Sequence, residues 1–348
     1  MKIKQATTSL QSTLICIITG GILWVFGTIA YGSLSWKEGN VELSSIQREN
    51  SGKYKFIQPL LECEDTSVAG SRKYIPFEKK LKENILAYQE KNHSGTFLSF
   101  YFRDLQNGPW FSNNYQEQFY PASLLKTPIL IGYVKWAESN PTILKEKILV
   151  EELVDYEQNY VPEKYAEVWK EYTVEQLLEI MTLYSDNNAS SNLLTHLPES
   201  ITDDVFSTLQ VPSPKDKTAE TYKLTVKEYA SFFRILFNAS YLSNAGSEAT
   251  LNLLSRVSFS RWITGKIPKD IKVAHKFGER IYNEEYPDWT IKKFAQLHDC
   301  GIVYYPGSPY LLCIMTRGDD LAQLSEMTQD ISKMIYDTVD ETRKRAVQ

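Results

Sequence analysis

The chain has 348 residues, of which 43% are hydrophobic and 23% charged, and its formal net charge is -5. This composition is that of a globular protein with enough chain to bury a core, and it excludes a low-complexity or repeat-built protein. The weakly acidic balance, without a sustained basic cluster, argues against nucleic acid as a partner.

The N-terminus predicts a membrane helix. No charged residue lies between Lys4 and Lys37, and the apolar run Leu14–Leu34 is about as long as a helix needs to cross the hydrocarbon core of a bilayer. Lys2 and Lys4 place the N-terminus on the cytoplasmic side. We therefore expect residues 1–36 to form a cytoplasmic stub and a transmembrane anchor, with the remaining chain outside the cytoplasmic membrane.

The alternative for this segment is a signal peptide that is cleaved near Ala30–Gly32, where small residues are present. The apolar run is long for a signal peptide, which favours the anchor, and both alternatives place the body outside the membrane. Residues 37–75 are polar and irregular, with scattered Gly, Ser and Pro, and we interpret them as a linker or stalk.

The remaining residues, 76–348, alternate between helical and strand patterns. Along the chain we predict a helix at 76–92, strands at 95–105 and after a turn at 107–111, a mostly helical stretch at about 122–255, strands at 272–280, 292–305 and 310–318, and a helix at 320–339. This order predicts an α+β fold, with an antiparallel sheet whose one face is covered by the terminal helices and the other by an all-helical subdomain.

Cysteine usage is sparse, and no CxxC spacing indicates a structural zinc site. Cys300 and Cys313 flank a predicted hairpin turn, so they would lie near each other on adjacent strands. A disulfide is permitted outside the cytoplasm. We expect two free buried thiols rather than a bond.

Three short motifs contain residues suited to nucleophilic catalysis. Ser123 and Lys126 stand three apart at the start of a predicted helix, which places them on one face, where a desolvated amine can accept the serine proton. Ser185 and Asn187 belong to "SDN" between two helical runs, and offer a hydroxyl that shuttles a proton and an amide that binds a carbonyl. Each motif alone is equally compatible with an ordinary helix start or loop.

The third motif is "HKFG", which places Lys276 and Gly278 on a predicted strand. The glycine lets a substrate approach the backbone, the lysine supplies charge, and the N–H of Glu279 can donate to an oxyanion. We expect His275 and His298 to be structural, and Asp186 to cap or brace its turn.

As a set and in this order, the motifs "SLLK", "SDN" and "KFG" resemble those of the penicillin-recognising serine hydrolases, in particular class A β-lactamases and their relatives. The resemblance covers about residues 76–345. It implies a β-lactamase/transpeptidase-like fold, in which Ser123 is the acylated nucleophile and Lys126 its proton acceptor. Ser185 then passes a proton to the leaving nitrogen. The resemblance requires no metal or other cofactor.

The resemblance also implies the groups that bind substrate. Asn187 orients the substrate amide, Lys276 holds positive charge near Ser185 and the substrate carboxylate, and the oxyanion donors are the backbone N–H groups of Ser123 and Glu279, next to Gly278.

Two positions depart from the family pattern. Phe277 stands where the family has a hydroxyl residue that binds the substrate carboxylate. Class A enzymes also carry a Glu-x-x-x-Asn whose glutamate positions the deacylating water. We expect no such glutamate between Asn187 and Lys276, since Glu199 and Glu220 do not match. Hydrolysis of an acyl-enzyme is then expected to be slow.

We therefore predict a membrane-anchored, monomeric serine hydrolase whose substrate is a β-lactam or a D-alanyl cell-wall peptide. Phe277 and the missing glutamate leave a second hypothesis, a binding or sensor ectodomain that is acylated once or binds peptide without chemistry. A purely structural ectodomain is a third hypothesis, which is disfavoured by the joint presence of five polar residues, Ser123, Lys126, Ser185, Asn187 and Lys276.

Overall fold

The computed structural model describes residues 48–49, 52–60, 77–106, 108–151, 160–215, 217–218, 221–285 and 289–347. The predicted membrane segment Leu14–Leu34 lies outside these residues. Within them, no helix has both the length and the apolar character needed to cross a bilayer. The anchor stays a prediction.

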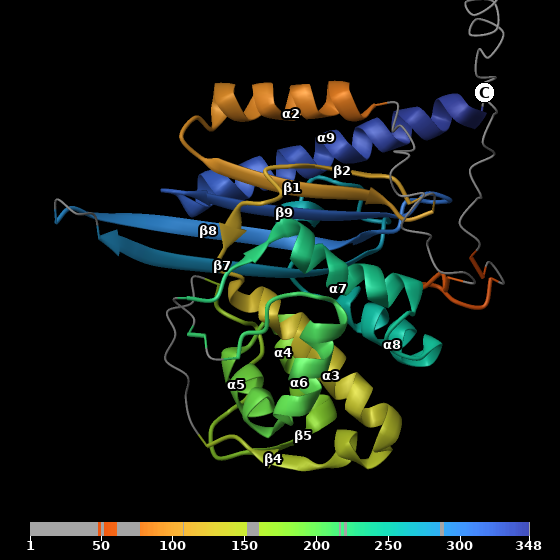
Figure 1. The fold of residues 1–348 in the computed structure, drawn as a ribbon, viewed down its shortest axis with the longest axis vertical. Coiled ribbons are helices and arrows are strands. Elements are labelled where there is room, and N and C mark those ends of the chain that lie inside the picture. The colour runs from red at the N-terminus through yellow and green to blue at the C-terminus, as the bar shows by residue number, and fades with distance from the viewer. Residues whose placement is uncertain are drawn as a thin grey trace, which may run out of the picture. The chain divides into compact units, whose positions relative to one another are not determined.

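A five-stranded antiparallel sheet is the centre of the domain, with the strand order β2-β1-β9-β8-β7 (Figure 1). Its strands are β1 (Phe97–Asp104), β2 (Trp110–Asn113), β7 (Val273–Glu285), β8 (Ile291–Val303) and β9 (Tyr310–Gly318). The first strand along the chain pairs with the last, in the register Phe100↔Ile314. This pairing leaves β7 as an edge strand of the sheet.

The terminal helices α2 (Glu78–Asn92) and α9 (Leu321–Val347) cover one face of the sheet, and a block of helices lies against the other (Figure 1). The predicted α+β arrangement is therefore confirmed. The block contains η2 (Ala122–Leu125), α3 (Lys126–Ser139), η3 (Pro141–Lys145), α4 (Val174–Tyr184), α5 (Asn187–His196), α6 (Glu199–Thr208), α7 (Val226–Asn238) and α8 (Asn244–Leu254), and η4 (Trp262–Thr264) follows it.

Short strands fix the connections of the block. They are β3 (Gln118–Phe119) with β6 (Leu224–Thr225), and β4 (Lys147–Leu149) with β5 (Glu171–Thr173). Thr173 and Thr225 each cap the following helix with a capping box, in which the threonine hydroxyl and the third helical side chain satisfy one another's backbone N–H groups. These caps set where α4 and α7 begin.

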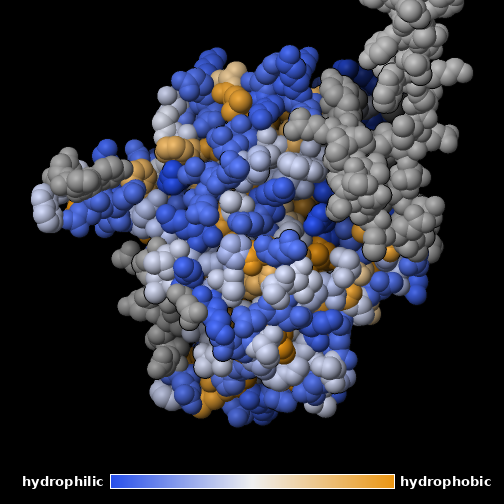
Figure 2. All heavy atoms as spheres, in the orientation of Figure 1, coloured by the Kyte–Doolittle hydropathy of each residue, from blue (hydrophilic) through white to orange (hydrophobic). Residues whose placement is uncertain are grey.

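The alternation of side chains along the strands divides the apolar residues into two cores. On β1, Phe100 and Phe102 pack with the side chains of α2 and α9, whereas Tyr101 belongs to the core shared with the helical block. Hydrophilic residues cover most of the visible face of the molecule (Figure 2). Because one of these cores lies on each face of the sheet, a shift of strand register would move apolar side chains to the wrong core, and the register is therefore fixed.

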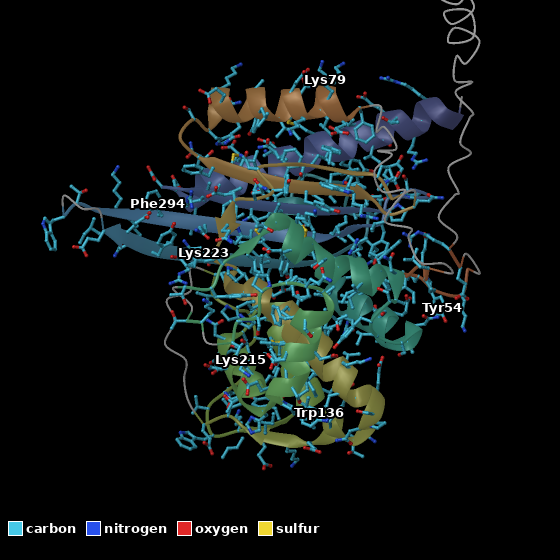
Figure 3. All side chains as sticks on the ribbon, viewed as in Figure 1. Tyr54, Lys79, Trp136, Lys215, Lys223 and Phe294 are labelled. Atoms are coloured by element: carbon cyan, nitrogen blue, oxygen red, sulfur yellow. A yellow bond between two sulfur atoms is a disulfide. The ribbon has the colours of Figure 1, made fainter. Side chains whose placement is uncertain are left out.

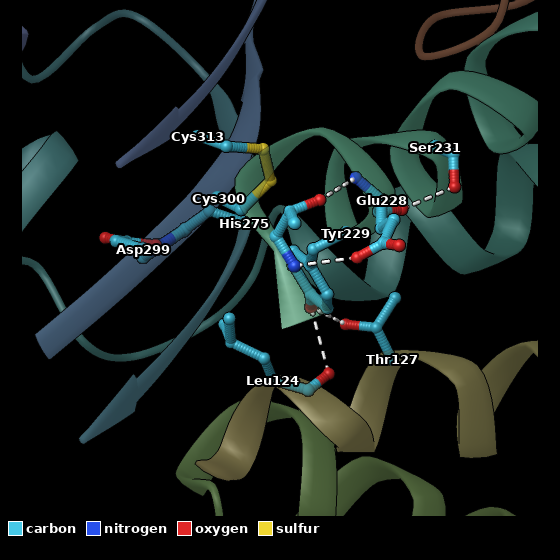
Figure 4. The surroundings of a disulfide bond; sticks show 10 residues. Leu124, Thr127, Glu228, Tyr229, Ser231, His275, Asp299, Cys300 and Cys313 are labelled. Atoms are coloured by element: carbon cyan, nitrogen blue, oxygen red, sulfur yellow. Dashed lines mark hydrogen bonds and ion pairs between the residues drawn. A yellow bond between two sulfur atoms is a disulfide. The ribbon is translucent and has the colours of Figure 1, made fainter. Parts of the chain in front are cut away.

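The pair Cys300 and Cys313 corrects our expectation of free thiols. The β8–β9 register sets the two residues directly opposite, with their Cα atoms 3.9 Å apart, and a disulfide joins them (Figure 4). Two flanking positions on a predicted hairpin do not reveal which strand residues face one another. The pairing was therefore decided by the register and not by the spacing.

Part of the expected linker also differs from the prediction. Residues 52–60 pack on the helical block, with Phe56 and Ile57 almost fully buried. The Glu248 carboxylate on α8 accepts three successive backbone N–H groups, those of Lys55, Phe56 and Ile57, at 2.8–3.1 Å. Residues 37–75 are therefore not an extended stalk over their whole length.

We predict that Glu248→Ala detaches this segment. The substitution removes one charged acceptor that serves three N–H groups, so we expect a loss of about 2 kcal/mol in the free energy of unfolding. Urea denaturation measures the free energy of unfolding, and limited proteolysis near residues 52–60 measures the detachment of the segment. Glu83→Ala on α2, an exposed glutamate, is the matched control, and equal stability of the two variants would contradict the clamp.

Candidate active site

Two features hold the backbone around Ser123. Ala122 has a left-handed φ of 49°, and Ser123 follows in the 3-10 turn η2, which leads into α3. The Tyr229 hydroxyl, from α7, donates to the backbone oxygen of Leu124 and also contacts the hydroxyl of Thr127, both at 2.9 Å (Figure 4). The strained residue and the buried hydroxyl together fix the start of the helix.

The Lys126 side chain hydrogen-bonds to residues of the first two predicted motifs. Its Nζ lies 2.9 Å from Ser123 Oγ, 3.3 Å from Ser185 Oγ and 2.7 Å from Asn187 Oδ1, and it also donates to the backbone oxygen of Ser185 at 2.6 Å. The lysine is only 3% exposed. The tertiary structure thus brings the first two sequence motifs together at one amine.

Hydrogen bonds of Asp186 and Asn188 hold the turn that carries Ser185. Ser185 ends α4 in the left-handed conformation, with φ 59°, and Asp186 caps α5 by accepting the N–H of Ala189 at 2.7 Å. The Asp186 carboxylate also accepts the N–H of Ala166 at 3.2 Å, and Asn188 donates to the oxygen of Ala166. The predicted bracing role of Asp186 is confirmed.

The third motif comes from the edge strand β7. Lys276 Nζ donates to Ser185 Oγ at 2.9 Å and to the backbone oxygen of Phe277 at 2.9 Å. At Gly278 a Cβ would lie 3.0 Å from the oxygen of Pro121 and 3.1 Å from the nitrogen of Ser123. The absence of a side chain at Gly278 lets the strand pass this close to the backbone of Ser123, whereas we had expected the glycine to admit a substrate.

Burial controls the protonation of both lysines. Desolvation lowers the pKa of Lys126 to about 7, against the opposing effect of the Asp186 carboxylate. Desolvation and the charge of Lys126 lower the pKa of Lys276 well below its ordinary value. A neutral amine beside Ser123 has a free lone pair, which is what a proton acceptor needs.

Phe277 lies in an aromatic cluster that sequence reasoning did not find. Its ring is 2% exposed and stacks on Phe259 with centroids 4.1 Å apart, while Tyr160 and Trp262 contact it edge-on. The Lys276 Nζ stands 4.0 Å from the centre of the same ring. No hydroxyl is therefore present at this position for a substrate carboxylate.

A connection between the two sides of the site also escaped the sequence analysis. The Glu279 carboxylate accepts the N–H of Tyr160 at 2.6 Å. Six residues later, Ala166 is held by Asp186 and Asn188 of the helical block. The segment from Tyr160 to Ala166 thus joins the edge strand to the turn that carries Ser185. Nothing in its composition signals this contact.

The glutamates considered as deacylating residues do not bind Ser123 or Lys126 in the part of the chain that the structure describes. Glu199 forms an exposed ion pair with Lys215, and Glu220 lies outside the described residues. Contrary to our expectation, Glu-x-x-x-Asn does occur once between Asn187 and Lys276, at Glu248–Asn252, but this stretch lies within α8, where Glu248 binds the N-terminal segment. No carboxylate in the described part of the chain hydrogen-bonds to Ser123 or Lys126.

The two strand histidines have structural partners, as expected. His275 pairs with Asp299 at 2.9 Å, with both side chains buried. His298 contacts the backbone oxygen of Tyr120 at 3.0 Å, and burial lowers its pKa to about 4, so it is neutral. The Gln296 side chain accepts the N–H of Tyr120 at 2.9 Å. Strand β8 therefore positions the chain three residues before Ser123.

The lowered pKa of Lys126 predicts a pH-dependent stability. The unfolded chain, whose lysine has its ordinary pKa of 10.5, binds a proton that the folded protein releases above about pH 7. Stability contributed by this group is complete above the unfolded pKa and is lost as the pH falls toward 7.

We therefore expect the unfolding free energy of the native protein, relative to that of Lys126→Met, to rise with pH by roughly 1 kcal/mol per pH unit between about pH 7.5 and 9.5. Urea denaturation across this range measures it. Lys79→Met, at an exposed lysine on α2, is the control. A difference that does not change with pH would show that Lys126 is charged in the fold.

Comparisons with known proteins agree with this geometry. The family model described as "Beta-lactamase enzyme family" matches residues 76–339. Among solved structures, a mutant of PBP-A in an acyl-enzyme complex with penicillin G is 20% identical with a TM-score of 0.60, and covers 76% of this chain and 97% of its own.

Two beta-lactamases are similar to the same extent. That of Sphaerobacter thermophilus has 18% identity and a TM-score of 0.60, with 75% of this chain and 96% of its own covered. The class A enzyme of Mycobacterium abscessus has 17% identity and a TM-score of 0.58, with 75% and 99% covered. The search of curated proteins gives no match. Because the family model spans the sheet, the helical block and all three motifs, this chain belongs to the beta-lactamase enzyme family.

Proposed function

We propose that this protein is a serine hydrolase that forms an acyl-enzyme on Ser123 with a β-lactam or a D-alanyl peptide amide. The observation that carries the proposal is the buried Lys126 amine, 2.9 Å from Ser123 Oγ and with its pKa near 7. Serine activated by an adjacent base is the general arrangement for covalent acyl transfer. The neighbouring Ser185 hydroxyl, within 2.9 Å of Lys276, supplies the second proton path.

The steps follow from the positions of these groups. Neutral Lys126 accepts the hydroxyl proton of Ser123 as Oγ forms a bond to the substrate carbonyl carbon. The carbon–nitrogen bond then breaks, and Ser185 gives its proton to the leaving nitrogen. Lys126, 3.3 Å from Ser185 Oγ, returns the proton it took, so the proton count balances. The N–H groups of Ser123 and Glu279 are the proposed oxyanion donors.

Asn187 has a defined orientation in this proposal. Its Oδ1 accepts from Lys126 at 2.7 Å, which leaves the Nδ2 group as the donor available to substrate. The side chain therefore binds a substrate carbonyl and not an N–H group. This assignment favours an amide-bearing acyl donor, such as a penicillin or an acylated peptide.

The expectation of slow deacylation leads to a second candidate, a binding or sensor ectodomain that stays acylated. The described residues place no carboxylate on Ser123 or Lys126 to activate water. Phe277 also gives substrate no hydroxyl. With the predicted membrane anchor, the domain would act outside the cytoplasmic membrane as a monomer, where cell-wall peptides and β-lactams are accessible.

The first test is intact-protein mass spectrometry after addition of a penicillin. We expect an added mass equal to that of the drug, absent from Ser123→Ala and retained by Ser139→Ala, a substitution of an exposed serine. Loss of the adduct within minutes would favour the hydrolase, and persistence for hours the sensor. If penicillins, cell-wall peptides and simple esters all leave the mass unchanged, the proposed chemistry is wrong.

The acylation rate should depend on the protonation of Lys126. Since only the neutral amine accepts the Ser123 proton, we expect the rate to rise with pH to a plateau, with a midpoint near the pKa of about 7. Lys126→Arg, which stays charged, should lower the rate by about 10²–10⁴-fold. Stopped-flow competition with a chromogenic β-lactam measures both. A flat profile in the native protein would assign the base to another group.

A further inference from the structure

Alternate residues of β7 face the catalytic groups. Lys276 contacts Ser185, and Gly278 lies against the backbone of Ser123. The next two residues in this series are Arg280 and Tyr282, because side chains on a strand repeat their direction every second residue. The odd-numbered Phe277, in contrast, packs into the core on the other face. The catalytic face of β7 thus continues past the nucleophile.

Arg280 and Tyr282 meet Tyr120, which lies three residues before Ser123. The Arg280 guanidinium stands 4.6 Å from the centre of the Tyr120 ring, and the Tyr282 ring contacts it edge-on at 5.2 Å. Lys223, on the segment that leads into β6, places its ammonium 4.7 Å from the same ring (Figure 3). Two separate segments, β7 and the chain before β6, therefore each bring a cation to Tyr120, close to Ser123.

Two cationic side chains, those of Arg280 and Lys223, lie at this place. Within the described residues Lys223 forms no ion pair, and both cations are half-buried, where a charge acts more strongly than at an open surface. A third cation nearby, Arg317, is paired with Glu117 at 3.0 Å. The Glu279 carboxylate is bound to the N–H of Tyr160.

We propose that Arg280 and Lys223 form a subsite for an anionic group on the acyl side of the substrate. The proposal rests on the acyl transfer argued above and names the class of acyl donor. Arg280 follows Gly278 by two residues, so the subsite is about 7 Å along the strand from the position facing the nucleophile. A carboxylate several bonds from the reacting carbonyl reaches it, and an arginine pairs well with that group.

The experiment uses two matched pairs of acyl donors. One is a benzylpenicillin and its analogue with a carboxylate on the benzylic carbon, and the other is N-acetyl- and N-succinyl-D-alanyl-D-alanine. The measured quantity is the ratio of acylation efficiencies, carboxylated over neutral, within each pair. We expect a ratio of about 10, which corresponds to about 1.4 kcal/mol, and a decrease of the ratio as salt is added.

Variants separate recognition from folding. Arg280→Gln and Lys223→Gln should each lower the ratio toward 1 by slowing only the carboxylated donor, and Arg280→Lys should restore part of it. Lys79→Gln, on α2 across the sheet, carries the same change of charge and should leave the ratio unchanged (Figure 3). A merely structural role of Arg280 would slow both donors equally.

The outcomes distinguish this proposal from the one on which it rests. Acylation at equal rates by both members of each pair would overturn the anionic subsite and leave the hydrolase intact. If no donor acylates Ser123, binding of the N-succinyl and N-acetyl peptides to Ser123→Ala, measured by calorimetry, decides the subsite alone. Equal or undetectable binding of both peptides then rejects it, and tighter binding of the N-succinyl peptide that is lost in Ser123→Ala/Arg280→Gln supports it.

Discussion

The burial of one amine organises this site. Lys126 lies out of water with its Nζ among the oxygens of Ser123, Ser185 and Asn187. Removing an ammonium from water is costly, so the fold lowers the pKa of the group to about 7. That shift turns an ordinary lysine into a base at neutral pH. The cost of holding the amine there is met by the packing of the sheet and the helical block, which together place its neighbours.

Each wall of the site comes from a different layer of the fold. The nucleophile is held at the start of α3 by Tyr229 of α7, and the edge strand β7 passes against it at Gly278. The backbone of Tyr120 is fixed by Gln296 and His298 of β8. The sheet therefore supplies the rigid edge, and the helices supply Lys126 and the turn with Ser185. A shift of either layer would separate Lys276 from Ser185, and Gly278 from Ser123.

Several departures from the family pattern lie on the strand β7. On one side of β7, Phe277 packs in a buried aromatic cluster. On the same side, the Glu279 carboxylate accepts the N–H of Tyr160 and so connects the strand to the segment 160–166. On the catalytic face of the same strand, Arg280 stands with Lys223 at Tyr120. In the proposal made above, the anionic group of the substrate binds farther along the strand than the family motif would place it. The N-terminal segment, bound by Glu248, adds an element to the body that the family motifs do not include.

The sequence by itself determined the order of helices and strands and the three motifs, because periodicity and short motifs are local properties of the chain. It also identified the capping role of Asp186 correctly, since a helix cap is a local requirement. Only the tertiary structure decided that Cys300 faces Cys313, that Glu248 binds residues 55–57, and that Tyr160 reaches Glu279. These contacts join residues far apart in the chain or depend on strand register. Local pattern contains neither, because both are fixed only when the two cores pack.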